Sequence, residues 1–153
     1  MAPASPKNWA AGSSVATGTL VDTGAIVALL DEGDGAHQAC RAALADVTLP
    51  LTTTIAVVSE LFHFLGDNSV RLRGAWRFVR SRAVTVMPID EQDLPNLERL
   101  MLKYADRPMD FADSTLVHLA EREGVVDILS IDSDFDVYRI GGRRLFRRFP
   151  KDR

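Results

Sequence analysis

The sequence predicts an α/β fold in three layers, with helices on both faces of a mostly parallel central sheet. Short apolar segments rich in β-branched residues alternate with helical patterns, as in parallel strands joined by crossover helices. The 153 residues suit one domain, and 46% hydrophobic with 25% charged residues is an ordinary globular composition. We expect residues 1–17, rich in Ala, Ser, Gly and Pro, to be a flexible N-terminal leader, and residues 18–153 to form the domain.

Local signals place the individual elements. The run from Gly18 to Asp22 predicts a short buried strand, and the apolar run from Ala25 to Leu30 predicts the helix that follows it. Further helices are expected over 35–46, 55–65, 69–82 and 91–104, with a last helix opened by Asp110 and ended by Gly124. Asp34, Thr54 and Asp90 are the expected caps of the helices over 35–46, 55–65 and 91–104, and Gly66 ends the second of these three. Strands are expected over 49–52, 84–89 and 127–130, with an edge strand over 144–149.

Composition excludes several classes of protein. Cys40 is the only cysteine, so neither an intramolecular disulfide nor a thiolate-only metal site can form. This usage is typical of the reducing cytoplasm, where we expect the protein to reside. The longest apolar run is far shorter than the ~20 residues that span a bilayer, and we find no secretory signal.

The basic residues are unevenly distributed in a chain of net charge −3. One cluster lies within residues 71–82 and a second within residues 139–153, and together they hold 12 of the 18 basic residues. Acidic charge therefore concentrates in the rest of the chain. Carboxylates for an ion beside arginines for phosphates are what a metal-dependent nuclease needs, although arginine-rich helix faces can also be simply solvated.

Carboxylates stand at the positions where such a fold builds a site. Asp22 and Asp132 each follow a predicted strand, and ligands bind at the carboxyl ends of parallel strands. Glu60 lies on a mainly apolar helix, where a buried carboxylate needs a partner such as a metal ion or an arginine. Asp110 and Asp113 are spaced to share one side of a helix.

Helix capping is the competing interpretation for several of these acids. It applies to Asp22, and more strongly to Asp110 than to Asp113. Of Asp132 and Asp134, we expect one to be a turn or cap residue and the other to face the pocket.

Converging carboxylates repel each other and raise each other's pKa values, and hard divalent cations relieve that repulsion. Magnesium prefers a few carboxylates and several retained waters, and a bound ion can activate water and neutralise phosphoryl charge. No ligand spacing indicates zinc, because the three histidines are isolated from one another.

Four segments of the chain together resemble the PIN domain, and specifically VapC-type toxins of bacterial toxin–antitoxin pairs. They are Leu20–Leu30, Thr53–Leu61, Tyr104–Glu121, and Ser130–Phe135 followed by Tyr138-Arg139. The resemblance covers roughly residues 18–149. It departs from the family at Ser130, where a threonine is common, and the first dozen or so residues have no counterpart.

The resemblance implies a three-layer PIN-like fold and a role for named acids. Asp22, Glu60, Asp113 and Asp132 would be catalytic residues and ligands of Mg²⁺, with Mn²⁺ as a substitute, and Asp110 and Asp134 would be accessory acids. Such proteins hydrolyse RNA, form homodimers and are held inactive by a small antitoxin. The density of arginines after Asp132 further predicts an RNA-binding rim beside the pocket, made of Arg139, Arg143, Arg144, Arg147 and Arg148.

Two other functions fit parts of the pattern. A phosphohydrolase with an aspartyl nucleophile needs a second aspartate two residues after the first, and here that position is Gly24. A non-catalytic RNA- or protein-binding module on the same fold would not require the full set of acids. A nuclease assay with and without EDTA separates this alternative from the enzyme.

Overall fold

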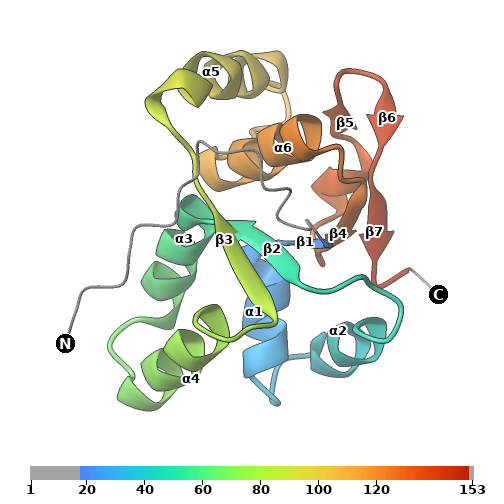
Figure 1. Ribbon diagram of the computed structural model, residues 1–153. Helices are drawn as coiled ribbons and strands as arrows, with labels where there is room; N and C mark the ends of the chain where they lie inside the picture. The colour runs from blue at the N-terminus through green and yellow to red at the C-terminus, as the bar shows by residue number, and fades with distance from the viewer. Residues whose placement is uncertain (1–17, 152–153) are drawn as a thin grey trace.

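The computed structural model describes residues 18–151, so the expected leader over residues 1–17 lies outside the described residues. A five-stranded sheet forms the middle of the molecule (Figure 1). All of its pairings are parallel, and the strand order is β3-β2-β1-β4-β7. The strands are β1 (Leu20–Val21), β2 (Leu51–Thr54), β3 (Val84–Met87), β4 (Asp127–Leu129) and β7 (Arg147–Phe149).

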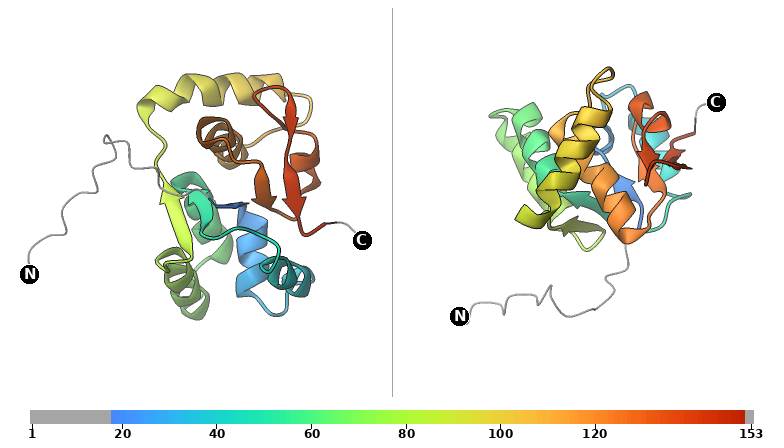
Figure 2. Two further views of the ribbon diagram at one scale, coloured as in Figure 1. Left: turned by 45° about the vertical axis from the view of Figure 1, so that its right-hand side comes forward. Right: turned by 90° about the horizontal axis from the view of Figure 1, so that it is seen from above.

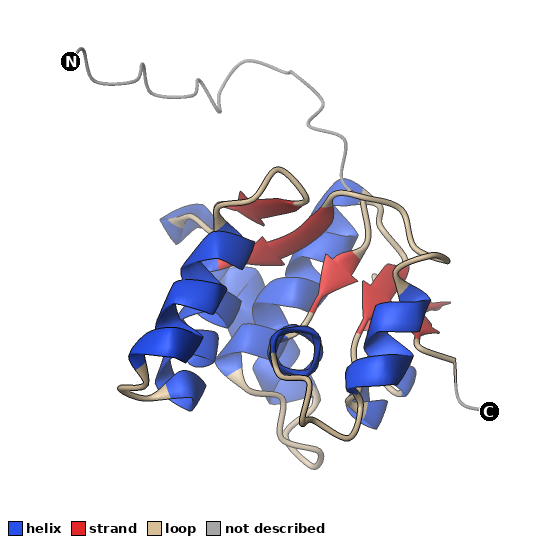
Figure 3. Ribbon diagram, turned by 90° about the horizontal axis from the view of Figure 1, so that it is seen from below, coloured by secondary structure: helices blue, strands red, loops and turns tan. Residues whose placement is uncertain are grey.

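Helices cover the sheet on two sides, which confirms the predicted three-layer α/β/α class. The helices are α1 (Thr23–Leu30), α2 (His37–Ala43), α3 (Ile55–Leu65), α4 (Ser69–Val79), α5 (Leu94–Lys103) and α6 (Phe111–Glu123). In Figure 1, α5 and α6 lie above the sheet and α1, α2 and α4 lie below it, while α3 contacts α1, α4 and α6. Figure 3 shows the strands between these helices. Within residues 18–151, no helix is both long and apolar enough to cross a bilayer.

The strand order reverses direction beside β1. The chain runs outward from β1 through β2 to β3, and it then returns to place β4 on the other side of β1. In open parallel sheets the carboxyl ends of the strands on either side of such a reversal leave a crevice between the loops that follow them. Asp22 directly follows β1 and Asp132 lies three residues after β4, so the topology brings both to this crevice.

Several helix ends agree with the local signals. The Thr54 hydroxyl accepts a hydrogen bond from the Val57 N–H at the start of α3, and Asp110 accepts one from the Asp113 N–H at the start of α6. Gly124 ends α6 with a φ of 69°, a left-handed conformation that side-chain-bearing residues rarely adopt. The Thr54 and Thr115 hydroxyls lie 2.8 Å apart and thereby tie the start of α3 to α6.

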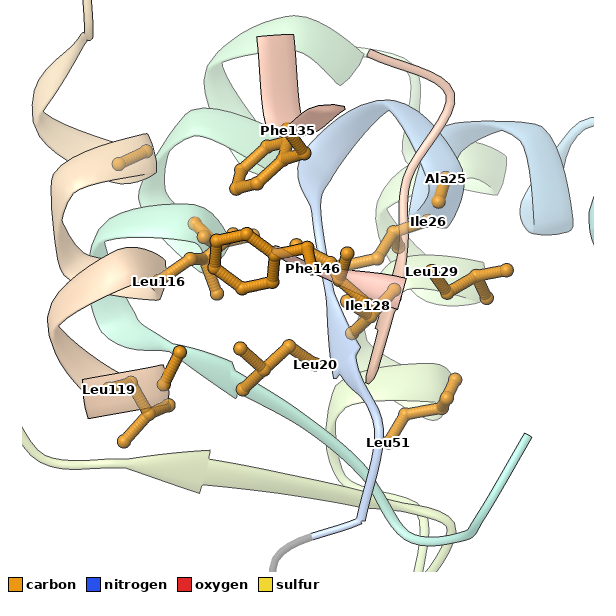
Figure 4. Packing of buried hydrophobic residues seen from close by; sticks show 14 of the residues in the cluster. Leu20, Ala25, Ile26, Leu51, Leu116, Leu119, Ile128, Leu129, Phe135 and Phe146 are labelled. Carbon is orange, nitrogen blue, oxygen red and sulfur yellow. The ribbon is translucent and has the colours of Figure 1, made fainter. Parts of the chain in front are cut away.

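The hydrophobic core lies between the sheet and α6 and between the sheet and α1. Leu20 and Ile128 from neighbouring strands, Leu116 and Leu119 from α6, and Phe135 are fully buried, and Figure 4 shows how they pack. Both residues of β1 and the last two residues of β4 are fully buried, which explains why Leu20-Val21 and Ile128-Leu129 are apolar rather than alternating. The loops that carry Asp22 and Asp132 therefore follow strands whose carboxyl ends are fully buried.

Three predicted elements differ in detail. Ala36, not Asp34, precedes α2, and Asp34 instead accepts a hydrogen bond from the Ala36 N–H in the turn before it. The helix expected from residue 91 begins as a 3₁₀ turn, Glu91–Asp93, and becomes α-helical only at Leu94.

The third difference lies in the C-terminal segment. The single edge strand expected over 144–149 is two strands, because residues 144–145 form β6 (Arg144–Leu145). This strand pairs antiparallel with β5 (Arg139–Ile140), and only β7 joins the sheet.

Candidate active site

A pocket of about 320 Å³ opens where the loops after β1 and β4 meet α3 and α6. Its lining includes all four acids predicted as catalytic: Asp22 after β1, Glu60 on α3, Asp113 on α6 and Asp132 after β4. The accessory acid Asp110 lines it as well. Four segments that are far apart in the sequence thus each contribute at least one carboxylate to the same small volume.

Asp22 is buried, with 6% of its surface exposed. One carboxylate oxygen accepts a hydrogen bond from the Thr23 N–H at 2.6 Å, and the other accepts one from the Ser130 hydroxyl at 3.0 Å. Burial raises the pKa of Asp22 to about 6, although both hydrogen bonds lower it, and the charges of Asp132 and Glu60 raise it further. Asp22 therefore caps α1 and also presents a carboxylate to the pocket.

Asp113 is the most strongly perturbed acid. It is 7% exposed, and its pKa is raised to about 8. Burial is the largest cause, and the charges of Asp22, Asp110 and Asp132 raise the pKa further. The Tyr138 hydroxyl donates a hydrogen bond to its Oδ2 at 3.2 Å. A buried acid surrounded by three like charges favours protonation unless a cation joins the group.

The acids after β4 take different roles. Asp132 accepts a hydrogen bond from the Asp134 N–H and also lines the pocket. We expected these two roles to be divided between Asp132 and Asp134, but Asp132 has both. Asp134 does not line the pocket, and its carboxylate instead pairs with Arg107 at 3.1 Å. The placement of Asp134 thus provides no direct support for an accessory role.

Glu60 reaches the pocket by a different route from the one anticipated. Its side chain is half-buried rather than enclosed in apolar surroundings, and Phe64 one turn further along α3 is 70% exposed. The need to neutralise a buried charge is therefore not what brings Glu60 to the site. Its support comes from its position in the pocket lining and from its charge, which raises the pKa of Asp22.

The donor set fits a hard divalent cation. All of the acids in the pocket offer oxygen ligands, and their crowding is the kind that such a cation relieves. In the described part of the chain, no three of these carboxylates are close enough to form a ready-made ligand group. Magnesium does not require one, because it binds through one or two carboxylates and keeps several waters.

Comparison with known proteins adds a family to this geometry. The PIN domain model matches residues 19–141, which include every acid of the pocket. The chain belongs to the PIN domain family. A search of curated proteins finds no match.

Among solved structures, the chain is similar to VapC20 of Mycobacterium tuberculosis, described as a toxin that cleaves the sarcin–ricin loop. The TM-score is 0.69 at 21% sequence identity, covering 78% of this chain and 93% of that one. At this identity the likeness concerns the fold of the PIN domain.

None of the arginines predicted as an RNA-binding rim lines the pocket of this PIN domain. Nε and Nη2 of Arg147 donate to the two carboxylate oxygens of Asp127, which lies at the amino end of β4 and therefore opposite the pocket. Arg148 makes the same bidentate contact with Asp136, and Arg139 donates to three backbone carbonyls of residues 136–138.

The other two members of that cluster, Arg143 and Arg144, lie on the exposed β5–β6 hairpin, which stands against α6 (Figure 2). The Gly141 N–H at the hairpin turn donates to Glu121, eight residues and about 12 Å along α6 from Asp113. The hairpin turn thus lies toward the end of α6 that is remote from the acids.

Two contacts of the pocket acids in this PIN domain were not predicted. Ser130 and Tyr138 belong to segments that sequence analysis singled out, but their hydrogen bonds to Asp22 and Asp113 join residues 108 and 25 positions apart. Asp34, expected only as a cap, also lines the pocket. The sequence feature that could have indicated the contact of Tyr138 is its hydroxyl, because a buried tyrosine hydroxyl needs a hydrogen-bond partner.

Proposed function

We propose that this protein is a Mg²⁺- or Mn²⁺-dependent endoribonuclease and the toxin component of a type II toxin–antitoxin system. The observation that carries the proposal is the convergence of four carboxylates from four separate segments on one pocket of a PIN domain. The likeness to VapC20, which is described as an RNA-cleaving toxin, supports it.

Asp22 and Asp113 would hold the ion, and Glu60 and Asp132 would bind it directly or through water. When bound, such an ion activates water and neutralises charge on a phosphoryl oxygen. The chain's own residues orient the ligands: Ser130 fixes one oxygen of Asp22, and Tyr138 fixes one oxygen of Asp113. A protein without this chemistry gains nothing from crowding acids whose pKa values rise to about 6 and about 8.

The partners follow from the same proposal. The substrate is RNA, a cognate small antitoxin inhibits the enzyme, the active form is a homodimer, and the protein acts in the cytoplasm. An RNA oligonucleotide that contains a sarcin–ricin loop is a suitable first substrate, because the similar toxin is described as cleaving that loop.

The deciding experiment is an RNA cleavage assay with purified protein. Cleavage is expected with Mg²⁺ or Mn²⁺, is expected to stop on addition of EDTA, and is expected to return with excess metal. Protein that binds the RNA but leaves it uncut in every metal condition would be the non-catalytic binding module instead.

Metal binding has a readout that does not depend on activity. We expect Mg²⁺ or Mn²⁺ to raise the melting temperature of the wild-type protein, because a ligand at a hundredfold excess over Kd stabilises the folded state by about 2.7 kcal/mol. Asp113→Asn should remove this increase, whereas Asp106→Asn, at an exposed acid outside the pocket, should keep it. Equal shifts in all three proteins would place the bound ion elsewhere.

A further inference from the structure

The outer face of α4 carries three arginines and a tryptophan. Arg73, Trp76, Arg77 and Arg80 are spaced by three or four residues, so they form one stripe along the helix, and they line a shallow hollow. All four are exposed. The Trp76 ring packs against Phe62 of α3 at a centroid distance of 4.7 Å, yet 53% of its surface is open to solvent. We call these four residues the α4 stripe.

The positive charge of the stripe is not neutralised by the protein. Arg71, on another face of α4, pairs with Asp31 at 3.7 Å. Across residues 18–151, none of Arg73, Arg77 and Arg80 has a carboxylate partner, although the chain has 21 acidic residues against 18 basic ones. Like charges three and four residues apart destabilise a helix slightly, although Arg77 and Arg80 gain from their place at its carboxyl end.

The stripe borders a groove that continues into the carboxylate pocket. The groove lies between α1, the end of α3 and the start of α4, and it shares Val27, Asp34 and Phe64 with the pocket. Val70, Arg71 and Gly74 form its wall on α4, and Asp31 and Glu32 line it where α1 ends. Arg73 and Arg77 each follow one of these wall residues by three positions and are therefore its neighbours on the helix surface. A chain molecule that leaves the pocket along the groove arrives at the stripe.

We propose that the α4 stripe binds single-stranded RNA that extends from the carboxylate pocket, with its guanidinium groups on phosphates and the Trp76 indole stacked on a base. This inference rests on the proposed function. Arginine binds phosphate in bidentate fashion, and proteins hold single strands without reading their sequence by combining positive side chains with an aromatic ring on which a base stacks. An acidic protein segment would also engage the arginines and Trp76, because both residue types are enriched at protein interfaces, and RNA is favoured because the groove joins the stripe to the carboxylate pocket.

The first measurement is the salt dependence of RNA affinity. Fluorescence anisotropy of a labelled single strand reports binding, in the Asp113→Asn background and without divalent metal. Arg73→Ala/Arg77→Ala should flatten the slope of log affinity against log salt by about 1–1.5, because each phosphate contact on a single strand contributes ~0.7. Arg143→Ala/Arg144→Ala removes the same charge from the exposed β5–β6 hairpin and should leave the slope unchanged. Equal changes in the two double variants, or none in either, would overturn the proposal.

The second measurement concerns stacking. Trp9 is the only other tryptophan, so Trp9→Phe makes Trp76 the sole indole. RNA should then quench the Trp76 fluorescence. Trp76→Leu should weaken binding about tenfold or more, and Trp76→Phe should restore most of it because a phenyl ring still stacks. The stripe would instead belong to an acidic protein partner if two results came together. RNA would bind without quenching Trp76, and Arg73→Ala/Arg77→Ala would lose binding of RNA and of poly-glutamate equally.

Three further outcomes separate the stripe from the other surfaces and from the nuclease proposal. A change of sedimentation mass in Arg73→Ala/Arg77→Ala with unchanged RNA affinity would make the stripe a contact between copies of the chain. Wild-type protein that never cuts RNA but binds it through the stripe would refute the nuclease alone. Cleavage that stays intact while the variants bind RNA normally would refute the stripe alone.

Discussion

Asp113→Asn is expected to lower the rate of RNA cleavage by about a thousandfold while the domain stays folded. A bound ion contributes several kcal/mol of charge stabilisation in the transition state, and each 1.36 kcal/mol is a factor of ten in rate. Asp22→Asn, Glu60→Gln and Asp132→Asn should each cause a comparable loss, because all four side chains line the same pocket.

Asparagine is the informative substitution at the capping positions. Asp22 and Asp132 accept backbone N–H groups through their side chains, and an asparagine oxygen can do the same, whereas alanine would remove the cap at a cost of about 1 kcal/mol. Asp106→Asn and Glu98→Gln, at exposed acids outside the pocket, serve as matched controls. Full activity in any of the four pocket variants, or loss of the circular dichroism signal in them, would contradict the shared role.

The metal-free protein is expected to lose stability as the pH rises from about 4 to about 8. The pKa of Asp113 is about 8 in the folded protein against an ordinary value of 3.8, and that of Asp22 is about 6. Between these limits the folded state binds more protons than the unfolded state, so the free energy of unfolding falls with rising pH and levels off above pH 8. Each pKa unit corresponds to about 1.4 kcal/mol, and the loss amounts to several kcal/mol.

Asp113→Asn should remove most of this dependence. At pH 8 its melting temperature without metal should exceed that of the wild-type protein by on the order of 10 °C, and the difference should almost vanish at pH 4. Thermal unfolding followed by circular dichroism at several pH values in EDTA measures both. If the pH profiles of Asp113→Asn and the wild type were parallel, Asp113 would not titrate as its surroundings indicate. The control variant Asp106→Asn should give a profile parallel to that of the wild type.

The parts of the fold that depend on local sequence could be predicted. Thr54 at the start of α3 and Gly124 at the end of α6 act through backbone groups within a few residues, so the printed sequence contains both partners. The alternation of strand and helix patterns likewise follows from local hydrophobic periodicity. That alternation was enough to place Asp22 and Asp132 at the same end of a parallel sheet.

The parts that depend on distant partners could not. Arg147 and Arg148 look like a free basic cluster, and only the folded chain brings Asp127 and Asp136 to them from 20 and 12 positions away. Conversely, Arg73, Arg77 and Arg80 looked no different from a solvated helix face, and their lack of carboxylate partners among residues 18–151 emerges only in three dimensions. Charge density along a sequence does not distinguish an arginine that is already paired from one that is available to phosphate.

The hydrogen bonds that hold Asp22 and Asp132 also bear on how tightly the pocket can bind a cation. A free carboxylate side chain loses rotamer freedom when it becomes a ligand, and that entropy opposes binding. Here Thr23 and Ser130 immobilise Asp22, and the Asp134 N–H immobilises Asp132, when the chain folds. The ordering of these two side chains therefore precedes the binding of any cation, and substitutions that loosen the loop after β4 should weaken metal affinity even where they leave every carboxylate of the pocket in place.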